Sequence, residues 1–567
     1  MKTFTVAVPK LYLADPSANA CEMVQCIRSA IDRKTDYLFF PELSITGCSC
    51  GDLFQMEFLA SRALDVLVKL AEKFRDSGLT FFIGLPLFID HAVYSVYAEV
   101  CRGKILAFYC KTNATSPFAA ALPPVSSFHI PGQENIPVLS DFSQYHPWCL
   151  NIDSVPAEGG SIERQRRKAR HSVGVYISVQ PGIYESTTDG VYSGFSLLAF
   201  NGNILAETVP FRENSQLCSA QMEENIPSDA IDIPEDRKCS DPAPFLPKSA
   251  EECNSVCSEI LAIQKTALFR RMETCHAKKL VLGISGGLDS TLALLAAAGT
   301  LKEHGKSSDS LIAVTMPGFG TTARTKSNAE LMAAALNCDL RRVDIRPACL
   351  QHFHDIGHDP ADHSVTYENT QARERTQILM DIANREGGIL VGTGDLSEIA
   401  LGWCTYNADH ISMYNPNCGI PKTLMRVMVR WYADSCDSPE LANILRDVLN
   451  TPVSPELLPA DENGSINQKT ENILGPYELH DFYIWHLVFL KEAPRDILNA
   501  AFAAFSGTYP QEEIIRTLKL FLKRFFTQQF KRSCSPDGPR TTPVSLSPRN
   551  AWRVPSDALD SSWTGDL

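Results

Sequence analysis

The pattern of hydrophobic and polar residues predicts an α/β domain in the first part of the chain. Short apolar, β-branched runs indicate strands at 4–13, 37–43, 80–88, 96–109 and 196–207. Apolar residues recur with the period of a helix over 21–33 and 57–78, and the second helix should end with Gly78 in the C-terminal capping position. Two of the strand regions should fold as hairpins that turn at Gly103 and Gly202.

A different pattern begins at about residue 249, where helical and strand-like segments alternate. They lie at 258–272, 278–284, 290–305, 311–318, 327–337, 340–345, 372–388 and 389–394. Such alternation predicts a parallel sheet covered by helices on both faces. Residues 435–567 are irregular and helical in character. A stretch rich in Pro, Asp and Ser near 225–248 should be a linker, which gives predicted domains at 1–235 and 249–560.

Composition and charge narrow the class of protein. A chain of 567 residues is too long for one hydrophobic core, and its net charge of −14 argues against nucleic acid or an anionic membrane as partner. Apolar runs are too short to span a bilayer, and the N-terminus lacks a signal-peptide pattern, so a cytoplasmic protein is expected. The eighteen cysteines include no pair of C-x-x-C units, so most are expected to be reduced packing residues.

The stretch LVLGISGGLDSTLAL (280–294) carries the clearest chemical signal. A strand-like run leads into Ser285, Gly286 and Gly287, and Ser290 lies in the first turn of the following helix. Glycines at such a turn let backbone N–H groups approach phosphate oxygens, and the helix dipole adds positive potential. Asp289 repels phosphate, so its presence indicates a hard cation such as Mg²⁺ between them. The alternative is a plain turn from strand to helix.

The S-G-G-x-D-S loop resembles that of the N-type ATP pyrophosphatases, which cleave ATP between its α and β phosphates. Further segments resemble NAD+ synthetase in its long, glutamine-dependent form, and they lie at 315–329, 367–384, 392–424, 451–464, 475–482, 528–540 and 545–558. The resemblance implies a shortened nitrilase-like αββα sandwich, followed by a doubly wound ATP pyrophosphatase domain with a helical C-terminal extension. It also implies a homo-oligomer.

The reaction that this resemblance implies is amidation of deamido-NAD+. ATP adenylates the nicotinate carboxylate and releases pyrophosphate, and ammonia then displaces AMP. By resemblance, Mg²⁺ is held by Asp289 and Glu398. ATP is assigned to Ser285, Gly286, Gly287, Asp289, Ser290, Thr393, Lys422 and Ser454. Deamido-NAD+ is assigned to Asn369, Glu398, Trp403, Tyr406, Asp409 and Lys531.

Some of these assignments have structural alternatives. Trp403 and Tyr406 are also suited to core packing, and Lys531 is also suited to a solvated basic face. The chain departs from the family at Ala408, where glycine is usual. If that position requires a positive φ, alanine distorts the backbone near Asp409, although loss of activity is not expected.

The N-terminal half resembles the family's glutaminase, a nitrilase-fold amidase with a Glu-Lys-Cys triad. Glu42 matches the general base, and Lys111 matches the lysine that stabilises the oxyanion. The family's Ile-Cys-Glu-Asp strand, which carries the nucleophile, has no match between Lys111 and Glu185, which are 74 positions apart. Cys149 and Ser178 are weak substitutes, and an ordinary loop cysteine or a bystander serine is the alternative for each.

Three hypotheses follow, because the motifs of the C-terminal half are retained whereas the nucleophile of the glutaminase half is not found. The first is an NAD+ synthetase that uses free ammonia beside a degenerate glutaminase. The second is a bifunctional enzyme that hydrolyses glutamine with Cys149 as nucleophile. The third is a non-catalytic scaffold or regulatory homologue, which should have lost residues in both halves; retention of Asp289, Glu398 and Lys422 argues against it.

Overall fold

The computed structural model describes residues 1–112, 115–120, 122–132, 134–140, 142–224, 226–230, 241–321, 323–451, 473–565 and 567. The chain folds into two compact units. Unit 1 comprises Met1–Ser186 and Val191–Glu235, and unit 2 comprises Thr187–Gly190 and Asp236–Leu567. Ser454, assigned to ATP from the sequence, lies outside the described residues.

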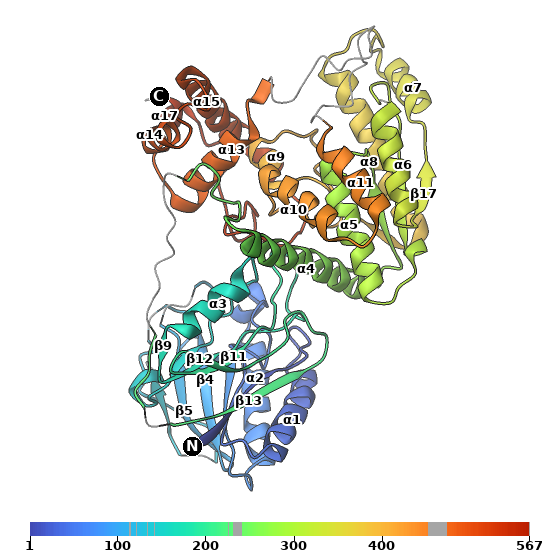
Figure 1. Cartoon of the computed structure of the whole chain (residues 1–567). Helices are drawn as coiled ribbons and strands as arrows, with labels where there is room; N and C mark the ends of the chain where they lie inside the picture. The colour runs from blue at the N-terminus through green and yellow to red at the C-terminus, as the bar shows by residue number, and fades with distance from the viewer. Residues whose placement is uncertain are drawn as a thin grey trace. The chain divides into compact units, whose positions relative to one another are not determined.

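Unit 1 is built on two large β-sheets (Figure 1). The first has eight strands in the order β13-β1-β2-β3-β4-β5-β7-β6. Their bounds are Lys2–Val8 (β1), Tyr37–Phe39 (β2), Thr80–Ile89 (β3), Ala92–Cys101 (β4), Lys104–Cys110 (β5), Ser127–Phe128 (β6), Ile136–Leu139 (β7) and Gln216–Met222 (β13). The second has the order β12-β11-β10-β8, with Cys149–Asn151 (β8), Val175–Ser178 (β10), Leu197–Phe200 (β11) and Asn203–Glu207 (β12). Ser172–Val173 (β9) and Asp229–Ala230 (β14) form a small separate pair.

Helices on the outer faces of the two sheets complete four layers in unit 1. The helices are Pro16–Asp32 (α1), Glu57–Lys73 (α2) and Ser161–Arg170 (α3), with short 3-10 turns at Gly51–Gln55 (η1) and Phe142–Gln144 (η2). Apolar residues of α1 and α2 pack on one face of the first sheet. Its other face meets the second sheet in an aromatic-rich core, and α3 covers the outside of the second sheet. The predicted αββα sandwich is confirmed.

Local sequence sets the two predicted hairpins of unit 1. The β4–β5 turn has Arg102 and Gly103 at φ values of +48° and +80°, and the β11–β12 turn has Asn201 and Gly202 at +48° and +77°. Two successive positive φ values are those of the type I′ turn that suits the twist of a hairpin. The prediction of a helix end at Gly78 is wrong. Helix α2 ends at Lys73, because the chain leaves the helix through a turn at residues 74–76.

Unit 2 contains a parallel sheet in the order β17-β16-β15-β18. Its strands are Lys279–Gly283 (β15), Leu311–Thr315 (β16), Asp339–Arg342 (β17) and Gly388–Leu390 (β18). The surrounding helices are Ala250–Thr274 (α4), Leu288–Glu303 (α5), Ala323–Ala335 (α6), Arg346–Ile356 (α7), Val365–Glu386 (α8), Leu396–Leu401 (α9), Lys422–Ser435 (α10) and Pro439–Leu449 (α11), with a 3-10 turn at Ser308–Ser310 (η3). Helices α7 and α8 pack on one face and α5 on the other, as alternation of segments predicts (Figure 1).

The C-terminal part of unit 2 is helical and has its own core. Its elements are Tyr477–Ile484 (α13), the π-helix Trp485–Leu490 (η4), Pro494–Ala504 (α14), Gln511–Thr527 (α15), Gln529–Arg532 (α16) and Ser561–Thr564 (α17). Aromatic and aliphatic side chains of α13, α14 and α15 pack together with residues of α9. This packing holds α9 in place, and α9 begins close to Asp289, near the glycine-rich loop between β15 and α5.

Within the described residues, every helix is too short or too polar to pass through a lipid bilayer.

Candidate active site

The glycine-rich loop of unit 2 joins β15 to α5. Gly286 has a φ of +83°, which is the left-handed region that glycine enters without steric strain. Ser285 Oγ accepts a hydrogen bond from the Gly287 amide at 3.2 Å, and Ser290 Oγ donates to the Gly287 carbonyl at 3.2 Å. Helix α5 has Gly287 as its N-cap residue and lacks a capping side chain. Its first N–H groups therefore suit an anionic oxygen.

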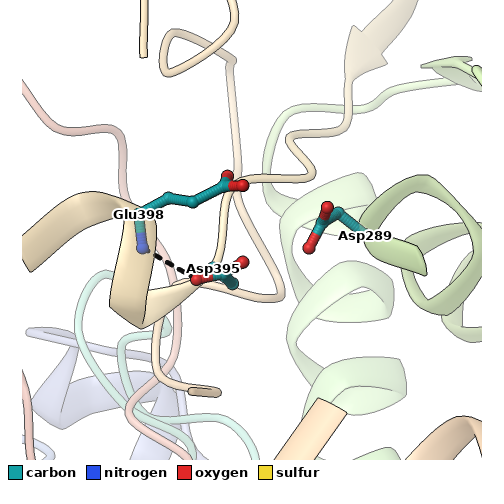
Figure 2. A group of neighbouring side chains, drawn as sticks. All are labelled: Asp289, Asp395 and Glu398. Carbon is teal, nitrogen blue, oxygen red and sulfur yellow. Dashed lines mark hydrogen bonds between the residues drawn. The ribbon is translucent and has the colours of Figure 1, made fainter. Parts of the chain in front are cut away.

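Three carboxylates meet in front of this loop. Asp289 on α5, and Asp395 and Glu398 around the start of α9, each offer an oxygen within 4.8 Å of the others (Figure 2). Asp395 is the N-cap of α9 and accepts a hydrogen bond from the Glu398 amide at 2.9 Å. Such a group of hard oxygen donors is the ligand set that Mg²⁺ prefers in proteins. The sequence predicts Asp289 and Glu398 as metal ligands, and Asp395, which it does not predict, lies with them.

Lys422, the first residue of α10, sits among these carboxylates. Its Nζ lies 2.7 Å from Asp289 Oδ1, 2.5 Å from Asp395 Oδ2 and 3.0 Å from Glu398 Oε1. The lysine side chain is 2% exposed. Tyr477 presents its ring 5.5 Å from the same ammonium, and its hydroxyl is buried without a hydrogen-bond partner among the described residues. One cation therefore faces three carboxylates at this site.

Burial dominates the electrostatics of this cluster. The pKa of Glu398 is raised to about 7, mainly by burial, with Lys422 lowering it and the charge of Asp289 adding to the rise. Burial also raises the pKa of Asp395 well above its usual value. Burial alone lowers the pKa of Lys422, but the surrounding carboxylates outweigh it and hold that pKa well above its usual value. The cluster thus holds its lysine charged, and an added cation competes with that lysine for the carboxylates.

A cavity of about 900 Å³ opens beside the cluster. It is lined by most of the residues assigned from the sequence, namely Ser285, Gly287, Asp289, Ser290, Asn369, Thr393, Glu398, Trp403, Tyr406, Asp409 and Lys531. Gly286 belongs to the glycine-rich loop and Lys422 to the carboxylate cluster, but neither of them lines the cavity. A cavity of this size accommodates a ligand larger than one nucleoside monophosphate. The structure thus brings segments far apart in sequence to one space.

The side of the cavity assigned to deamido-NAD+ is organised by Thr405. Its hydroxyl donates to Asn369 Oδ1 at 2.8 Å, and its amide donates to Asp409 Oδ1 at 2.7 Å. Burial raises the pKa of Asp409. Lys531 Nζ donates to the carbonyls of Gly402 and Cys404, at 2.9 and 2.6 Å. In this structure the ammonium therefore tethers α16 to the loop after α9.

The two aromatic residues assigned to the substrate differ in their surroundings. Trp403 lines the cavity and also packs against the C-terminal core, with the Arg524 guanidinium 5.0 Å from its ring. Tyr406 is 38% exposed and has Phe530 as a ring neighbour at 5.4 Å. Tyr406 is therefore the more accessible aromatic face.

Alanine at position 408 does not require a positive φ. The residue in the left-handed region is its neighbour Asn407, at φ +56°, and Ala408 is fully buried. Asparagine tolerates this conformation better than most residues, because its short polar side chain can bond locally. Because Ala408 does not have a positive φ, the distortion of the backbone near Asp409 that its replacement of glycine could cause does not arise.

In unit 1, Glu42 and Lys111 meet beyond the ends of two strands of the first sheet, β2 and β5, between which β3 and β4 lie. Glu42 follows β2 and is 7% exposed, and Lys111 follows β5. Glu42 accepts hydrogen bonds from Lys111 Nζ at 3.0 Å and from Ser95 Oγ at 2.9 Å. A Cβ atom at Gly84 would lie 2.2 Å from the Leu43 amide nitrogen, so glycine there lets the loop that carries Glu42 pass close to β3.

The chain that follows β8 also reaches this pair. Ser154 N donates to Glu42 Oε2 at 3.2 Å, and Asp153 Oδ1 lies 2.8 Å from Lys111 Nζ. Burial lowers the pKa of Lys111, but the carboxylates of Glu42 and Asp153 outweigh it, and the pKa is raised. The lysine is therefore held by two carboxylates. Neither Asp153 nor Ser154 was singled out in the sequence.

The two substitute nucleophiles lie elsewhere in the second sheet. Cys149 pairs with Tyr176 across β8 and β10 and packs in the core beneath α3. Its neighbour Leu150 faces the opposite side, toward the first sheet. Ser178 is fully buried in β10. A second thiol, Cys48, is close to the Glu42 pair, and its side chain meets those of Ser154 and Tyr192. Burial raises the pKa of Cys48 well above its usual value.

Comparison with known proteins gives one consistent result. The sequence model of the NAD synthase family matches residues 260–530. The chain is 30% identical to the glutamine-dependent NAD(+) synthetase of Mycobacterium bovis, across 98% of this chain and 96% of that protein. It is 24% identical to the enzyme of that name from Acinetobacter baylyi, across 98% and 99% of the two chains.

Solved structures show the same fold. A glutamine-dependent NAD(+) synthetase from Cytophaga hutchinsonii superposes with a TM-score of 0.80 at 17% identity, covering 100% of this chain and 99% of that one. The glutamine-dependent NAD+ synthetase of Acinetobacter baumannii, solved with adenosine diphosphate, gives a TM-score of 0.63 at 19% identity, covering 97% and 99%. The predicted fold class is confirmed for both units.

Proposed function

This chain belongs to the family of glutamine-dependent NAD(+) synthetases, and from that premise we propose that its second unit amidates deamido-NAD+ through an adenylated nicotinate carboxylate. The family makes the chain an NAD+ synthetase, a ligase that uses ATP. One observation carries the finer proposal. The glycine-rich loop and the carboxylate cluster, which holds Lys422, lie beside one cavity that Asn369 and Asp409 also line.

The proposed binding of ATP follows from the loop. Its backbone N–H groups and the start of α5 face the phosphates, where helix dipole and amides favour negative charge. Lys422 donates its charge to the β and γ phosphates as they leave, which stabilises the pyrophosphate more than the intact ATP. Ser285 and Ser290 hold the loop in shape through their bonds to Gly287.

Mg²⁺ fits the donor set of the cluster. Asp289, Asp395 and Glu398 would hold the ion, and all three are oxygen ligands that lie within 4.8 Å of one another. When bound, the ion neutralises phosphate charge and orients the triphosphate. The same place is filled here by the Lys422 ammonium, so this lysine and the ion share one set of carboxylates.

The chemistry divides into two balanced steps. A carboxylate oxygen of the nicotinate attacks the α-phosphorus of ATP, the bond from that phosphorus to the bridging oxygen breaks, and pyrophosphate leaves. Ammonia then attacks the activated carbonyl carbon, AMP leaves, and the nitrogen loses a proton to give the amide. The residues proposed to hold the dinucleotide all line the cavity: Asn369, Trp403, Tyr406, Asp409 and Lys531.

We further propose that free ammonia is the nitrogen source. Two features of unit 1 support this: the Ile-Cys-Glu-Asp motif is missing, and Asp153 and Ser154 engage the groups that a glutaminase would use. The rival is a bifunctional enzyme. It requires a thiol at the Glu42 pair, and Cys149 packs on the outer side of the second sheet, whereas Cys48 lies close to the pair.

An AMP-release assay tests these proposals. Full-length protein with Mg²⁺, ATP and deamido-NAD+ should release AMP with ammonium chloride and far less with glutamine. Equal turnover with both donors, lost in Cys48→Ala or Cys149→Ala but only with glutamine, would establish the bifunctional enzyme instead. No AMP with either donor would favour the scaffold.

Two further expectations belong to the proposal. The family resemblance implies a homo-oligomer, which light scattering during size-exclusion chromatography would measure directly. A cytoplasmic location is proposed from the scattered cysteines, which suit a reducing compartment. Fractionation of cells that express the chain would test the location.

A further inference from the structure

A cysteine and a histidine that have no role in the proposed reaction lie together near the cavity. His410 Nε2 is 3.4 Å from Cys534 Sγ, and His410 Nδ1 is 3.1 Å from the carbonyl oxygen of Thr405. A carbonyl oxygen only accepts hydrogen bonds, so Nδ1 carries the ring proton. In the neutral ring, Nε2 therefore has its lone pair directed at the thiol. Burial lowers the pKa of His410, which favours this neutral form.

The arrangement has the form of an activated nucleophile. A thiol faces a base, and a third group, the Thr405 carbonyl, orients that base. The thiol is also 3.2 Å from the backbone carbonyl of Lys531. Cys534 is exposed, so small reagents can reach its sulfur from solvent.

The pair sits at the wall of the cavity. His410 lines the cavity, as do Phe530 and Lys531, which precede Cys534 by one helical turn. The His410 ring also packs on the Tyr406 ring, with the two centroids 5.8 Å apart. A group added to the sulfur of Cys534 would therefore press on residues that face the cavity.

We propose that Cys534 is a site of covalent modification by small soft electrophiles and by peroxides, with His410 as the base that removes the thiol proton. With an alkyl halide, sulfur forms a bond to carbon, halide leaves with its electron pair, and His410 takes the proton. With a peroxide, sulfur attacks one oxygen and the O–O bond breaks. Sulfur is then oxidised by two electrons to a sulfenic acid, and the departing oxygen takes a proton to leave as water or an alcohol.

The consequence for function rests on the proposed role of the cavity. An adduct on Cys534 displaces His410 and Phe530 toward the space assigned to deamido-NAD+. Modification should therefore weaken binding of that ligand.

Alkylation rates of single cysteines test the reactive thiol itself. The full-length protein is treated with limiting iodoacetamide at pH 7, and labelled peptides are quantified by mass spectrometry over time. Cys21 is the internal control, because it is also exposed and its sulfur lies near a backbone carbonyl, Ser17 O at 3.8 Å, and not an imidazole. Cys534 should react at least about tenfold faster than Cys21, below what a well-positioned base usually contributes.

The variant His410→Gln separates the base from mere exposure. Glutamine can accept a hydrogen bond from the thiol but cannot take its proton, so the Cys534 rate should fall to that of Cys21, with the Cys21 rate unchanged. A Cys534 rate equal to that of Cys21 in the wild type, or unchanged in His410→Gln, overturns the proposal. A thermal melt of the variant checks its fold, and His410→Asn serves as a second variant if the first is destabilised.

Ligand binding tests the functional consequence separately. Calorimetry with deamido-NAD+ should show weaker binding after alkylation of the wild type and no change after the same treatment of Cys534→Ser. Equal weakening in both overturns the consequence. Alkylation rates are measured without any enzymatic turnover. The test of the reactive thiol therefore remains valid even if the proposed amidation does not occur.

Discussion

The Lys422 ammonium lies 2.7 Å from a carboxylate oxygen of Asp289, although the two residues are 133 positions apart in the chain. Asp395 and Glu398 complete a cluster in which one buried cation faces three carboxylates. Removal of one partner from a buried charged cluster leaves the others without compensation, which is far more costly than loss of a surface pair. The structure therefore predicts a site whose stability depends on which cation fills it.

Replacement of this lysine should make the protein dependent on divalent metal. Lys422→Met should destabilise the metal-free protein by about 3 kcal/mol or more, because three carboxylates then lack a counter-charge. Mg²⁺ should raise the melting temperature of the variant by more than it raises that of the wild type. Lys265→Met is the control, since Lys265 forms a partly exposed pair with Glu303 and should cost under about 1 kcal/mol. An equal response of variant and wild type to Mg²⁺ would show that lysine and ion do not share the site.

The carboxylates themselves should be needed for both metal binding and AMP release. Asp289→Asn keeps the shape of the side chain and removes one charge, so turnover with ammonium should fall by about 100-fold. Binding of Mn²⁺, followed by electron paramagnetic resonance, should weaken in the same variant. Asp344→Asn is a matched control, because Asp344 is exposed and pairs with Arg346. Unchanged Mn²⁺ binding in Asp289→Asn would remove this residue from the metal site.

The sequence predicts features that depend on adjacent residues. The hairpins at Gly103 and Gly202 could be located because a two-residue turn with positive φ angles favours glycine, which stands at the second place of both turns. The loop from Ser285 to Ser290 could be located for a similar reason, since its spacing places amides at the start of one helix.

Features that depend on contacts between distant segments could not be predicted from local sequence patterns. Asp395 is an ordinary helix N-cap in sequence, and only folding brings it to Lys422. Asp153 and Ser154 meet Glu42 and Lys111 because β8 pairs with β10, and no local pattern specifies that pairing. The wrong helix end at Gly78 has a local cause, because a glycine after a periodic run marks a cap only if the helix continues to it.

The Glu42 pair of unit 1 should contribute to stability and not to ammonium-dependent turnover. Glu42→Gln removes the charge that Lys111 and Ser154 N face, and should cost about 1–3 kcal/mol. Its AMP release with saturating ammonium should stay within about twofold of the wild type, because the reaction proposed for unit 2 draws no group from this pair. Glu72→Gln, which breaks an exposed pair with Arg75, serves as the control for stability. Loss of ammonium-dependent AMP release in a folded Glu42→Gln protein would contradict the proposal that unit 2 carries out this reaction without the Glu42 pair.

Acid should destabilise unit 2 partly through one buried histidine. Burial lowers the pKa of His480 to about 4, below the value of about 6.5 expected in the unfolded chain. His480 Nε2 donates to the Leu474 carbonyl at 3.0 Å, and Nδ1 has no hydrogen-bond partner among the described residues, so a second proton would be buried without an acceptor. The unfolded chain therefore binds the extra proton first, and stability is lost as pH falls from about 6.5 toward 4, by at most ~3 kcal/mol.

The variant His480→Gln removes this titration and should flatten the fall in melting temperature between pH 6.5 and pH 4.5. His352→Gln, at an exposed position on α7, should leave the fall unchanged. NMR of ¹⁵N-labelled histidine gives an independent measure, because the His480 ring should remain neutral at pH 5. A His480 ring that titrates near pH 6.5 in the folded protein would contradict the assigned burial effect, whatever the melting curves show.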